Sequence, residues 1–397
     1  MALSILILFF AVYFFASGFL LVTYVNPGET NATSTVAAVV ATTTTTTPTS
    51  TTTPIIVTHV KTPSAVKAVY MTSCYAGSKD LRAGIVSLID TTELNSIIID
   101  VKDYTGMISF LPENPAWADY LSTRCHARDM KAFIKVLHDK GIYVIARITV
   151  FQDPFYAKKN PAAAVKLASD KSVLWKDRKG INYIDPGSRQ AWEHTAQLSE
   201  ESYAIGFDEI NFDYIRFPSD GNMKDIYYPY SEGKLKVEVM KSFFEFLHNR
   251  FASTSIVTSA DLFGMVTTNT DDLGIGQNLE YALANFDYVA PMVYPSHFPA
   301  TWNGLKNPAQ NPYEVIKISM TRAAERARVA TTTPLKLRPW LQDFNMGATY
   351  TADMVRAQIQ ATYDSGLTSW MMWDPSNTYT AGAFLPANSS LVGSGNQ

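Results

Sequence analysis

The chain has 397 residues, 47% of them hydrophobic and 17% charged, which excludes a wholly disordered or fibrous protein. Its 33 basic and 36 acidic residues give a formal net charge of −3, and this balance argues against a nucleic-acid partner. Two cysteines exclude a disulfide-rich scaffold and a four-cysteine zinc site. The six histidines lack H-x-x-x-H and H-E-x-x-H spacing, so we predict no metal site and no cofactor.

The N-terminal segment, residues 1–28, is predicted to be a transmembrane anchor. Residues 3–25 carry no charged side chain, and as a helix they are long enough to cross a hydrocarbon core of about 30 Å. A cleaved signal peptide is the rival interpretation. Its apolar region is usually only about 7–15 residues long and follows a basic start, whereas no Lys or Arg precedes Lys61 here.

Residues 29–63 have the composition of a disordered linker. The run TTTTTTPTSTTTP at residues 42–54 has no apolar periodicity, and its prolines oppose helix. Thr- and Pro-rich tracts of this kind act as extended stalks. A stalk after an anchor predicts a single-pass protein of the cell membrane whose remaining domain is extracytoplasmic. Residues 387–397 are predicted to be a flexible tail.

Residues 64–386 alternate short β-rich apolar runs with amphipathic helical runs. The alternation occurs eight times and predicts parallel strands joined by helical crossovers, which is a (β/α)8 TIM barrel. A doubly wound open sheet is the rival fold, but no G-x-G-x-x-G or GxxxxGK[ST] motif occurs to support it. The eight strands are predicted at residues 65–73, 96–103, 142–151, 207–217, 255–263, 286–294, 335–343 and 367–374.

The two cysteines follow neighbouring strands of the predicted barrel. Cys74 comes directly after the first strand, and Cys125 lies between the second strand and the next helix. Both therefore fall near one end of adjacent units, where a disulfide is geometrically feasible and where an oxidising location would permit it. Two separate buried thiols are the alternative.

Active sites of such barrels lie at the C-terminal ends of the strands, so polar residues there are the candidates. Because alternate strand residues point inward, Glu209, Asn211 and Asp213 face the interior, with Asp213 last, at the mouth. By the same phase, Asp261 ends the fifth strand. The other candidates for the site are Asp100, Asp103, Arg147, Arg216, Tyr294, His297, Gln342, Trp373 and Asp374.

Carboxylates surrounded by Arg, Tyr, Trp and Gln are typical of a site that cleaves sugars. Glycosidic cleavage needs one protonated and one ionised carboxyl, and aromatic rings stack on the apolar faces of sugars. An inward Asp beside Arg or Lys is equally consistent with an ion pair that fills a barrel layer. For Glu209, deeper in its strand, we favour that structural interpretation.

Four segments resemble the signature segments of the putative glycoside hydrolase domain family, bacterial proteins of the TIM-barrel glycosidase clan. They are ELNSIIIDVKDYTGMISF, GFDEINFDYIRFPSDG, APMVYPSHF and SWMMWDPSN, and the resemblance extends from Lys67 to Phe384. It implies a barrel that acts on a polysaccharide. The second segment is also similar to the chitinase pattern D-x-x-D-x-D-x-E, but Ile215 occupies the position of the acid Glu, which argues against chitinase chemistry.

The leading hypothesis is a monomeric, membrane-anchored glycoside hydrolase with a two-carboxylate mechanism and a polysaccharide or oligosaccharide substrate. Asp213 is the predicted nucleophile or base and Asp261 the acid, or the two roles are reversed; Asp100 and Asp374 are alternative partners. The alternative function is a barrel that binds carbohydrate at the cell surface without cleaving it. An esterase is disfavoured because no G-x-S-x-G motif is present.

Overall fold

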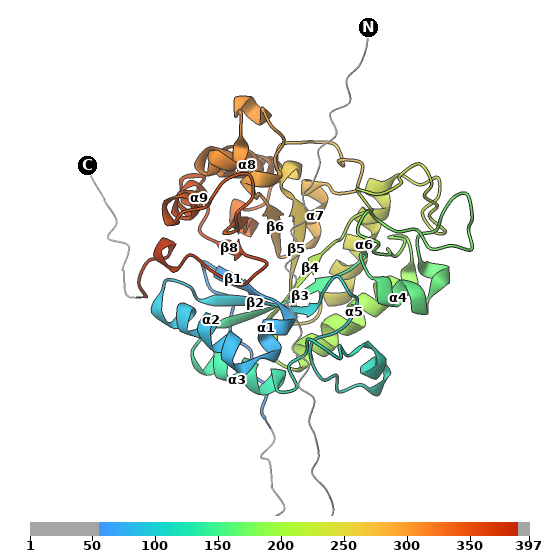
Figure 1. The fold of residues 1–397 in the computed structure, drawn as a ribbon, viewed down its shortest axis with the longest axis horizontal. Helices are drawn as coiled ribbons and strands as arrows, with labels where there is room; N and C mark the ends of the chain where they lie inside the picture. The colour runs from blue at the N-terminus through green and yellow to red at the C-terminus, as the bar shows by residue number, and fades with distance from the viewer. Residues whose placement is uncertain (1–54, 388–397) are drawn as a thin grey trace, which may run out of the picture. The chain divides into compact units, whose positions relative to one another are not determined.

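The computed structural model describes residues 55–387, which form a closed barrel of eight parallel strands (Figure 1). The strands pair in sequence order, and β1 closes the barrel against β8. The predicted (β/α)8 architecture is therefore confirmed. The strands are β1 (Lys67–Met71), β2 (Ser96–Lys102), β3 (Tyr143–Thr149), β4 (Glu209–Asp213), β5 (Val257–Phe263), β6 (Tyr288–Met292), β7 (Trp340–Gln342) and β8 (Trp370–Trp373).

Helices surround the barrel between successive strands (Figure 1). Two short helices, α1 and α4, come directly after β1 and β3, and the longer helices provide the crossovers. The helices are α1 (Ser73–Gly77), α2 (Lys79–Thr91), α3 (Met130–Asp139), α4 (Pro154–Lys159), α5 (Arg189–Ala204), α6 (Lys236–Phe251), α7 (Leu279–Asn285), α8 (Pro312–Val329) and α9 (Ala352–Asp364).

The predicted anchor at residues 3–25, most of the predicted linker and nearly all of the tail lie outside the described residues. No helix within residues 55–387 is both long enough and apolar enough to cross a bilayer.

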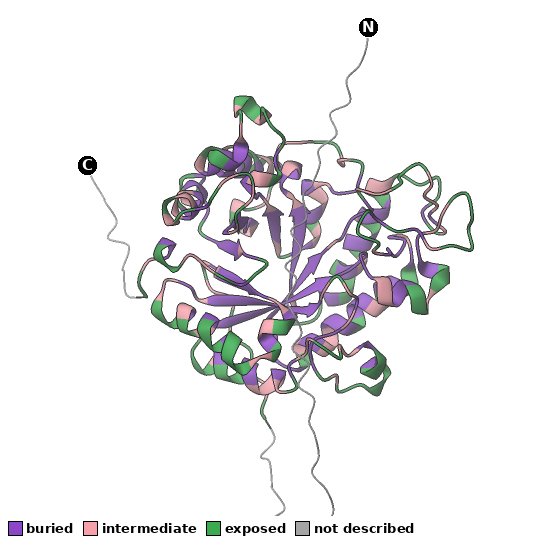
Figure 2. Ribbon diagram, in the orientation of Figure 1, coloured by how far each residue is buried: buried purple, intermediate pink, exposed green. Residues whose placement is uncertain are grey.

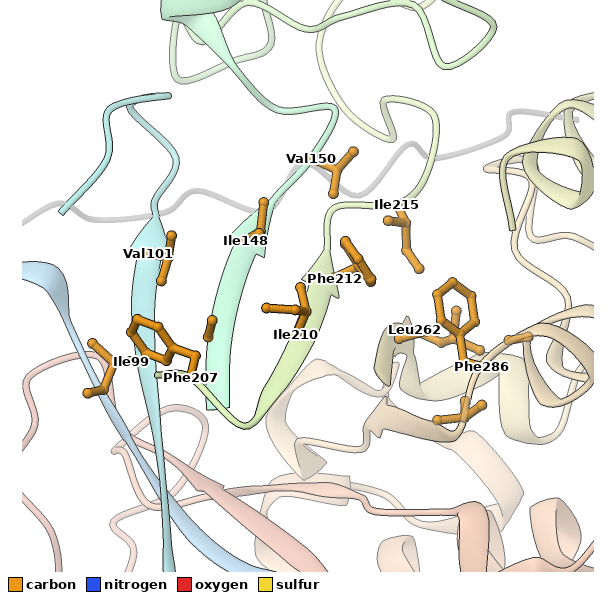
Figure 3. Packing of buried hydrophobic residues seen from close by; sticks show 14 of the residues in the cluster. Ile99, Val101, Ile148, Val150, Phe207, Ile210, Phe212, Ile215, Leu262 and Phe286 are labelled. Atoms are coloured by element: carbon orange, nitrogen blue, oxygen red, sulfur yellow. The ribbon is translucent and has the colours of Figure 1, made fainter. Parts of the chain in front are cut away.

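The hydrophobic core has two layers, because alternate strand residues point to opposite sides of the barrel wall. The outer layer lies between strands and helices; Figure 3 shows Ile99 of β2, Ile148 of β3, and Ile210 and Phe212 of β4 within it. A smaller inner layer fills the barrel and includes Ile145. Burying one such side chain contributes about 1.5–3 kcal/mol, and Figure 2 shows that burial is concentrated on the strands and the inner faces of the helices.

The seventh strand is shorter than predicted: residues 340–342 instead of 335–343. Pro334 begins a 3-10 turn in which the Thr333 side chain accepts a hydrogen bond from the Leu335 amide, so the first part of the predicted strand is a turn. Pro339 has no N–H to donate to the sheet, and β7 begins directly after it.

The described part of the predicted linker, residues 55–63, makes specific contacts at the N-terminal end of the barrel. The Val60 amide donates to Asp208 Oδ1 at 2.7 Å, and Asp208 Oδ2 lies 3.0 Å from His138 Nε2. The His59 ring stacks on Tyr203 with 3.9 Å between ring centroids. Asp208 and these partners therefore fix the segment that leads into the barrel.

Cys74, in α1, and Cys125 form a disulfide, with their Cα atoms 4.2 Å apart. The bridge joins the loop regions that follow β1 and β2, as the chain order of the two residues predicts. The bridge closes the loop between Cys74 and Cys125, and this closure stabilises the fold by about 3–4 kcal/mol because it restricts the unfolded chain.

Candidate active site

A cavity of about 450 Å³ lies at the C-terminal end of the strands, the end at which TIM-barrel active sites occur. Asp213, the last residue of β4, and Asp261 of β5 both line this cavity. The sequence predicted that these two carboxyls lie at the mouth on neighbouring strands, and β4 does pair with β5. Five other predicted residues share the cavity wall: Arg147, Arg216, Tyr294, His297 and Trp373.

Arg147 is the centre of the charged network. Its Nη1 donates to Asp100 Oδ1 at 2.6 Å and its Nη2 donates to Asp213 Oδ2, while its Nε lies 3.9 Å from Asp261 Oδ2. The guanidinium thus reaches from its own strand, β3, to carboxyls on β2, β4 and β5. All of these groups are buried, so the pairs replace the hydration that the charges lose on folding.

Asp261 is in an environment that favours the protonated carboxyl. Its Oδ1 accepts hydrogen bonds from Asn211 Nδ2 and Trp340 Nε1, both at 2.8 Å, whereas its Oδ2 has no hydrogen-bond partner among the described residues. Burial, followed by the charge of Asp213, raises the pKa of Asp261 well above its usual range, and this outweighs the opposing effect of Arg147. A proton on Oδ2 at neutral pH is consistent with this arrangement.

Asp213 is held by N–H donors at both oxygens. The Tyr214 amide donates to Oδ1 at 2.5 Å, and Arg147 donates to Oδ2. An acceptor-only carboxylate satisfies both donors without a proton of its own. Tyr214 has a φ of 52°, so the chain turns sharply after β4 and aims its amide back at Asp213. The two carboxyls of the cavity thus differ in their surroundings: a cation and a backbone amide donate to Asp213, whereas two neutral side chains donate to the deeply buried Asp261.

Asp100 binds the same arginine but does not line the cavity. Tyr70 donates a hydrogen bond to its Oδ2, and burial raises its pKa to about 6 despite the opposing charge of Arg147. Its position behind Arg147 makes it a less suitable partner for Asp213 than Asp261.

Aromatic rings form part of the cavity wall. Tyr294 and Trp373 line it with ring centroids 6.5 Å apart, and Trp373 stacks on Tyr70 at 3.9 Å. His297 lies at the rim, with its ring centroid 5.3 Å from that of Tyr294 and its Nδ1 3.0 Å from Ser296 Oγ. Flat apolar surfaces beside carboxyls suit a ligand with both apolar and hydroxylated faces.

Three predicted site residues are engaged in loop contacts outside the cavity wall. Asp103 accepts from the Thr105 amide at 2.9 Å, and Asp374 accepts from the Ser376 amide at 2.5 Å. Gln342 accepts from the Ser296 amide at 3.1 Å through its Oε1. These side chains fix the loops that carry the wall, and Asp374 is thereby less suitable as the second carboxyl.

Glu209 has the structural role that its depth in β4 suggested. Its Oε2 accepts from Arg338 Nη1 at 2.7 Å and from the Tyr143 hydroxyl at 2.9 Å, and all three residues are buried below the cavity. Within residues 55–387, no group of three His, Cys, Asp or Glu side chains is arranged to hold a metal ion.

The residues around the site that were not among the predicted candidates include Tyr70, Lys179, Tyr214 and Trp340. Strand phase could have indicated two of them. Trp340 lies two residues before Gln342, on the same side of its strand, and Tyr70 lies on the same side of its strand as Ala68. Lys179 lies in the long segment between β3 and α5, where no periodic pattern applies, so its position depends on how that loop folds.

Comparison with known proteins identifies the family of the chain. Residues 68–379 match the family described as "Putative glycosyl hydrolase domain", and the chain belongs to this family. No curated protein sequence matches the chain.

Among solved structures, the chain is similar to the glycoside hydrolase domain of PgaB (BpsB) from Bordetella bronchiseptica, with 14% identity, a TM-score of 0.52, and coverage of 78% of this chain and 94% of that domain. It is also similar to alpha-L-fucosidase isoenzyme 2 from Paenibacillus thiaminolyticus, with 13% identity, a TM-score of 0.53, and coverage of 81% of this chain and 47% of that one. A hypothetical protein from Ruminiclostridium thermocellum is 29% identical, with a TM-score of 0.44, over 52% of this chain and 98% of that one. The first two similarities concern the barrel fold.

Proposed function

We propose that the protein is a glycoside hydrolase that cleaves glycosidic bonds of a polysaccharide with two carboxyls, Asp213 and Asp261. The observation that carries the proposal is that these two groups line one cavity in different surroundings: Arg147 donates to Asp213, whereas burial and the charge of Asp213 raise the pKa of Asp261. Membership of the glycosyl hydrolase family supports the reaction class. Glycosidic cleavage requires such a pair.

In this mechanism Asp261 is the general acid. Asp261 lines the cavity, its raised pKa favours the protonated carboxyl, and its buried Oδ2 has no hydrogen-bond partner among the described residues; in this proposal its proton goes to the leaving glycosidic oxygen. Asp213 is the ionised partner, which attacks the anomeric carbon or activates water, and Arg147 stabilises its negative charge before the reaction. Tyr294 and Trp373 provide rings on which a sugar stacks.

We also propose that the barrel acts as a single chain on the extracytoplasmic side of the cell membrane, anchored through residues 3–25. The charge-free apolar run of those residues and the Thr-rich tract after it support this location. The Cys74–Cys125 disulfide supports an oxidising compartment.

A carbohydrate-binding barrel without hydrolytic activity is the second candidate. The observation that favours it is the ion pair between Arg147 and Asp213, because a fully neutralised carboxylate is also what a purely structural network contains. In a hydrolase the two carboxyls are needed for turnover. In a binding barrel they are needed only for the shape of the cavity.

The test is to measure release of reducing ends by the full-length protein from a panel of polysaccharides. On a glycan that the wild type cleaves, Asp213→Asn and Asp261→Asn should each lower kcat by about 10²–10⁴-fold, since each removes a group that acts in the transition state. Asp103→Asn is the matched control, because this carboxyl also follows a strand but lies outside the cavity. Glycan binding without turnover by the wild type would instead support the binding barrel, and full activity in both cavity variants would remove Asp213 and Asp261 from the mechanism.

A further inference from the structure

We infer that the cavity recognises a sugar that carries a carboxylate, a hexuronic acid residue, and that Arg216 is the residue that binds its carboxylate. This inference rests on the proposed function, since it assumes that the cavity holds a glycan. It concerns the part of the cavity wall that carries positive charge, the side chains of Arg216 and Lys179, and not the two carboxyls.

Arg216 is a buried guanidinium with unused donors. It is only 7% exposed, and its Cζ lies 4.8 Å from the Tyr214 ring centroid and 4.7 Å from that of Phe263. Its Nη1 donates to Phe217 O at 3.1 Å and to Ser219 Oγ at 3.2 Å. The described residues offer no acceptor to its Nε and Nη2 groups, neither atom is among the buried unpartnered ones, and Arg216 lines the cavity.

Neither cation of this wall has an ionic partner. Among the described residues, no carboxylate oxygen lies within 4.0 Å of the Arg216 guanidinium or of the Lys179 ammonium group. Asp177 is close in sequence to Lys179, but its Oδ1 accepts from the amides of Lys179 and Ile181, and its Oδ2 accepts from Gln152. Arg147, by contrast, is paired with two carboxylates.

The wall is held in place by contacts between two long loops, so Arg216 does not depend on a ligand for its position. The loop after β3 and the loop after β4 are joined by Asp185, whose Oδ2 accepts from the amides of both Tyr230 and Ser231. Gly221 lies against Trp175, where a Cβ would approach that indole to 2.7 Å. The Trp175 indole N–H donates to Asn222 O at 3.0 Å.

A planar guanidinium with two free N–H donors matches the geometry of a carboxylate, which it binds through two parallel hydrogen bonds. A neutral sugar has a hydroxymethyl group in place of the carboxylate and gives the buried Arg216 guanidinium no counter-charge. In a cavity of low polarity its binding is therefore less favourable than that of a uronate. With Asp213 paired to Arg147 and Asp261 protonated, the unpaired charge of the cavity is positive.

The experiment measures binding and cleavage of matched tetrasaccharides by the full-length protein. The probes are tetrasaccharides of galacturonate, glucuronate and mannuronate, each compared with the neutral form made by reducing its carboxyls to primary alcohols. We expect at least one uronate to bind about 10–100-fold more tightly than its reduced form, the range of a charge-assisted hydrogen-bond pair. We expect Arg216→Gln to abolish that preference and Lys179→Gln to weaken it.

Two further variants test whether the uronate preference depends on the Arg216 guanidinium itself and on charges that line the cavity. Arg216→Lys retains the charge but not the planar fork, and should show an intermediate preference. Arg178→Gln removes an exposed charge next to Lys179 but outside the cavity, and should leave the preference unchanged. Thermal unfolding of each variant checks that the loops still fold; if Arg216→Gln is unfolded, Lys179→Gln and Arg216→Lys decide the question.

The outcomes separate this inference from the proposed function. If the protein cleaves a neutral glycan and prefers no uronate to its reduced form, the inference is overturned and the hydrolase proposal stands. If a uronate binds in an Arg216-dependent way but no glycan is cleaved, the inference stands and the hydrolase proposal fails. A uronate preference that survives Arg216→Gln in a folded protein overturns the role of Arg216.

Discussion

Replacement of Arg147 by methionine should destabilise the fold strongly at neutral pH and much less in acid. Methionine fills a similar volume but leaves Asp100 and Asp213 as buried carboxyls without their cation. Removing one partner of a buried ion pair costs about 3–5 kcal/mol, because the other charge stays desolvated. With two carboxylates on one guanidinium, we expect the upper part of that range at pH 7.5.

The pH dependence follows from the pKa of Asp100, which is about 6 even though Arg147 lowers it. Without Arg147 this pKa is higher still, and the value in the unfolded chain is about 3.9. A carboxyl with a raised pKa in the folded state contributes stability that is fully present below the unfolded pKa and is lost as the pH rises through the folded pKa. The variant therefore loses more stability than the wild type between pH 4.5 and pH 7.5.

The assay is urea unfolding of the full-length protein, followed by tryptophan fluorescence at pH 4.5 and pH 7.5. Arg178→Met is the control, because this arginine is exposed and should change the free energy of unfolding by no more than about 0.5 kcal/mol. A deficit of less than about 1 kcal/mol for Arg147→Met at pH 7.5, or a deficit equal at both pH values, would refute the assignment of Arg147 as the counter-charge of the network.

Three further predictions concern separate parts of the molecule. Asp261→Asn should keep or raise the melting temperature at pH 7 while activity is lost, because burial already disfavours the charged form; a clear fall in Tm contradicts this. Asp208→Ala should speed tryptic cleavage after Lys61, since it removes the acceptor of the Val60 amide; equal cleavage rates would deny Asp208 that role. Thiol titration of unreduced, denatured protein should find no free thiol, and the Cys74→Ser/Cys125→Ser double variant should lose about 3–4 kcal/mol of stability; two free thiols would exclude the bridge.

The barrel was predictable because apolar residues recur with different periods in its strands and in its helices. Ile210 and Phe212 alternate with Asn211 and Asp213 in β4, and that alternation assigns one pair to the outer layer and the other to the interior. The length of β7 was not predictable from apolar content, because the prolines on either side of Leu335 to Arg338 decide where the sheet can begin.

The site was predictable where it depends on strand phase, and not where it depends on loops. Asp213 and Asp261 meet at the cavity because neighbouring parallel strands end at the same edge. Asp103 and Asp374 follow strands as well, but their loops turn their carboxyls onto local amides. Lys179 reaches the cavity only through the fold of the segment after β3, which has no repeat from which its position could be derived.

The central claim is that Asp261 is a protonated acid beside an ionised Asp213, and carbon-13 NMR of protein labelled at the aspartate carboxyl carbons tests it without knowledge of the substrate. At pH 7.5 we expect a protonated carboxyl resonance that is absent from Asp261→Asn and retained in Asp103→Asn. Asp100, with a pKa of about 6, should be mostly ionised at that pH. A spectrum at pH 7.5 in which every aspartate carboxyl is ionised would contradict the assignment of Asp261 as the acid.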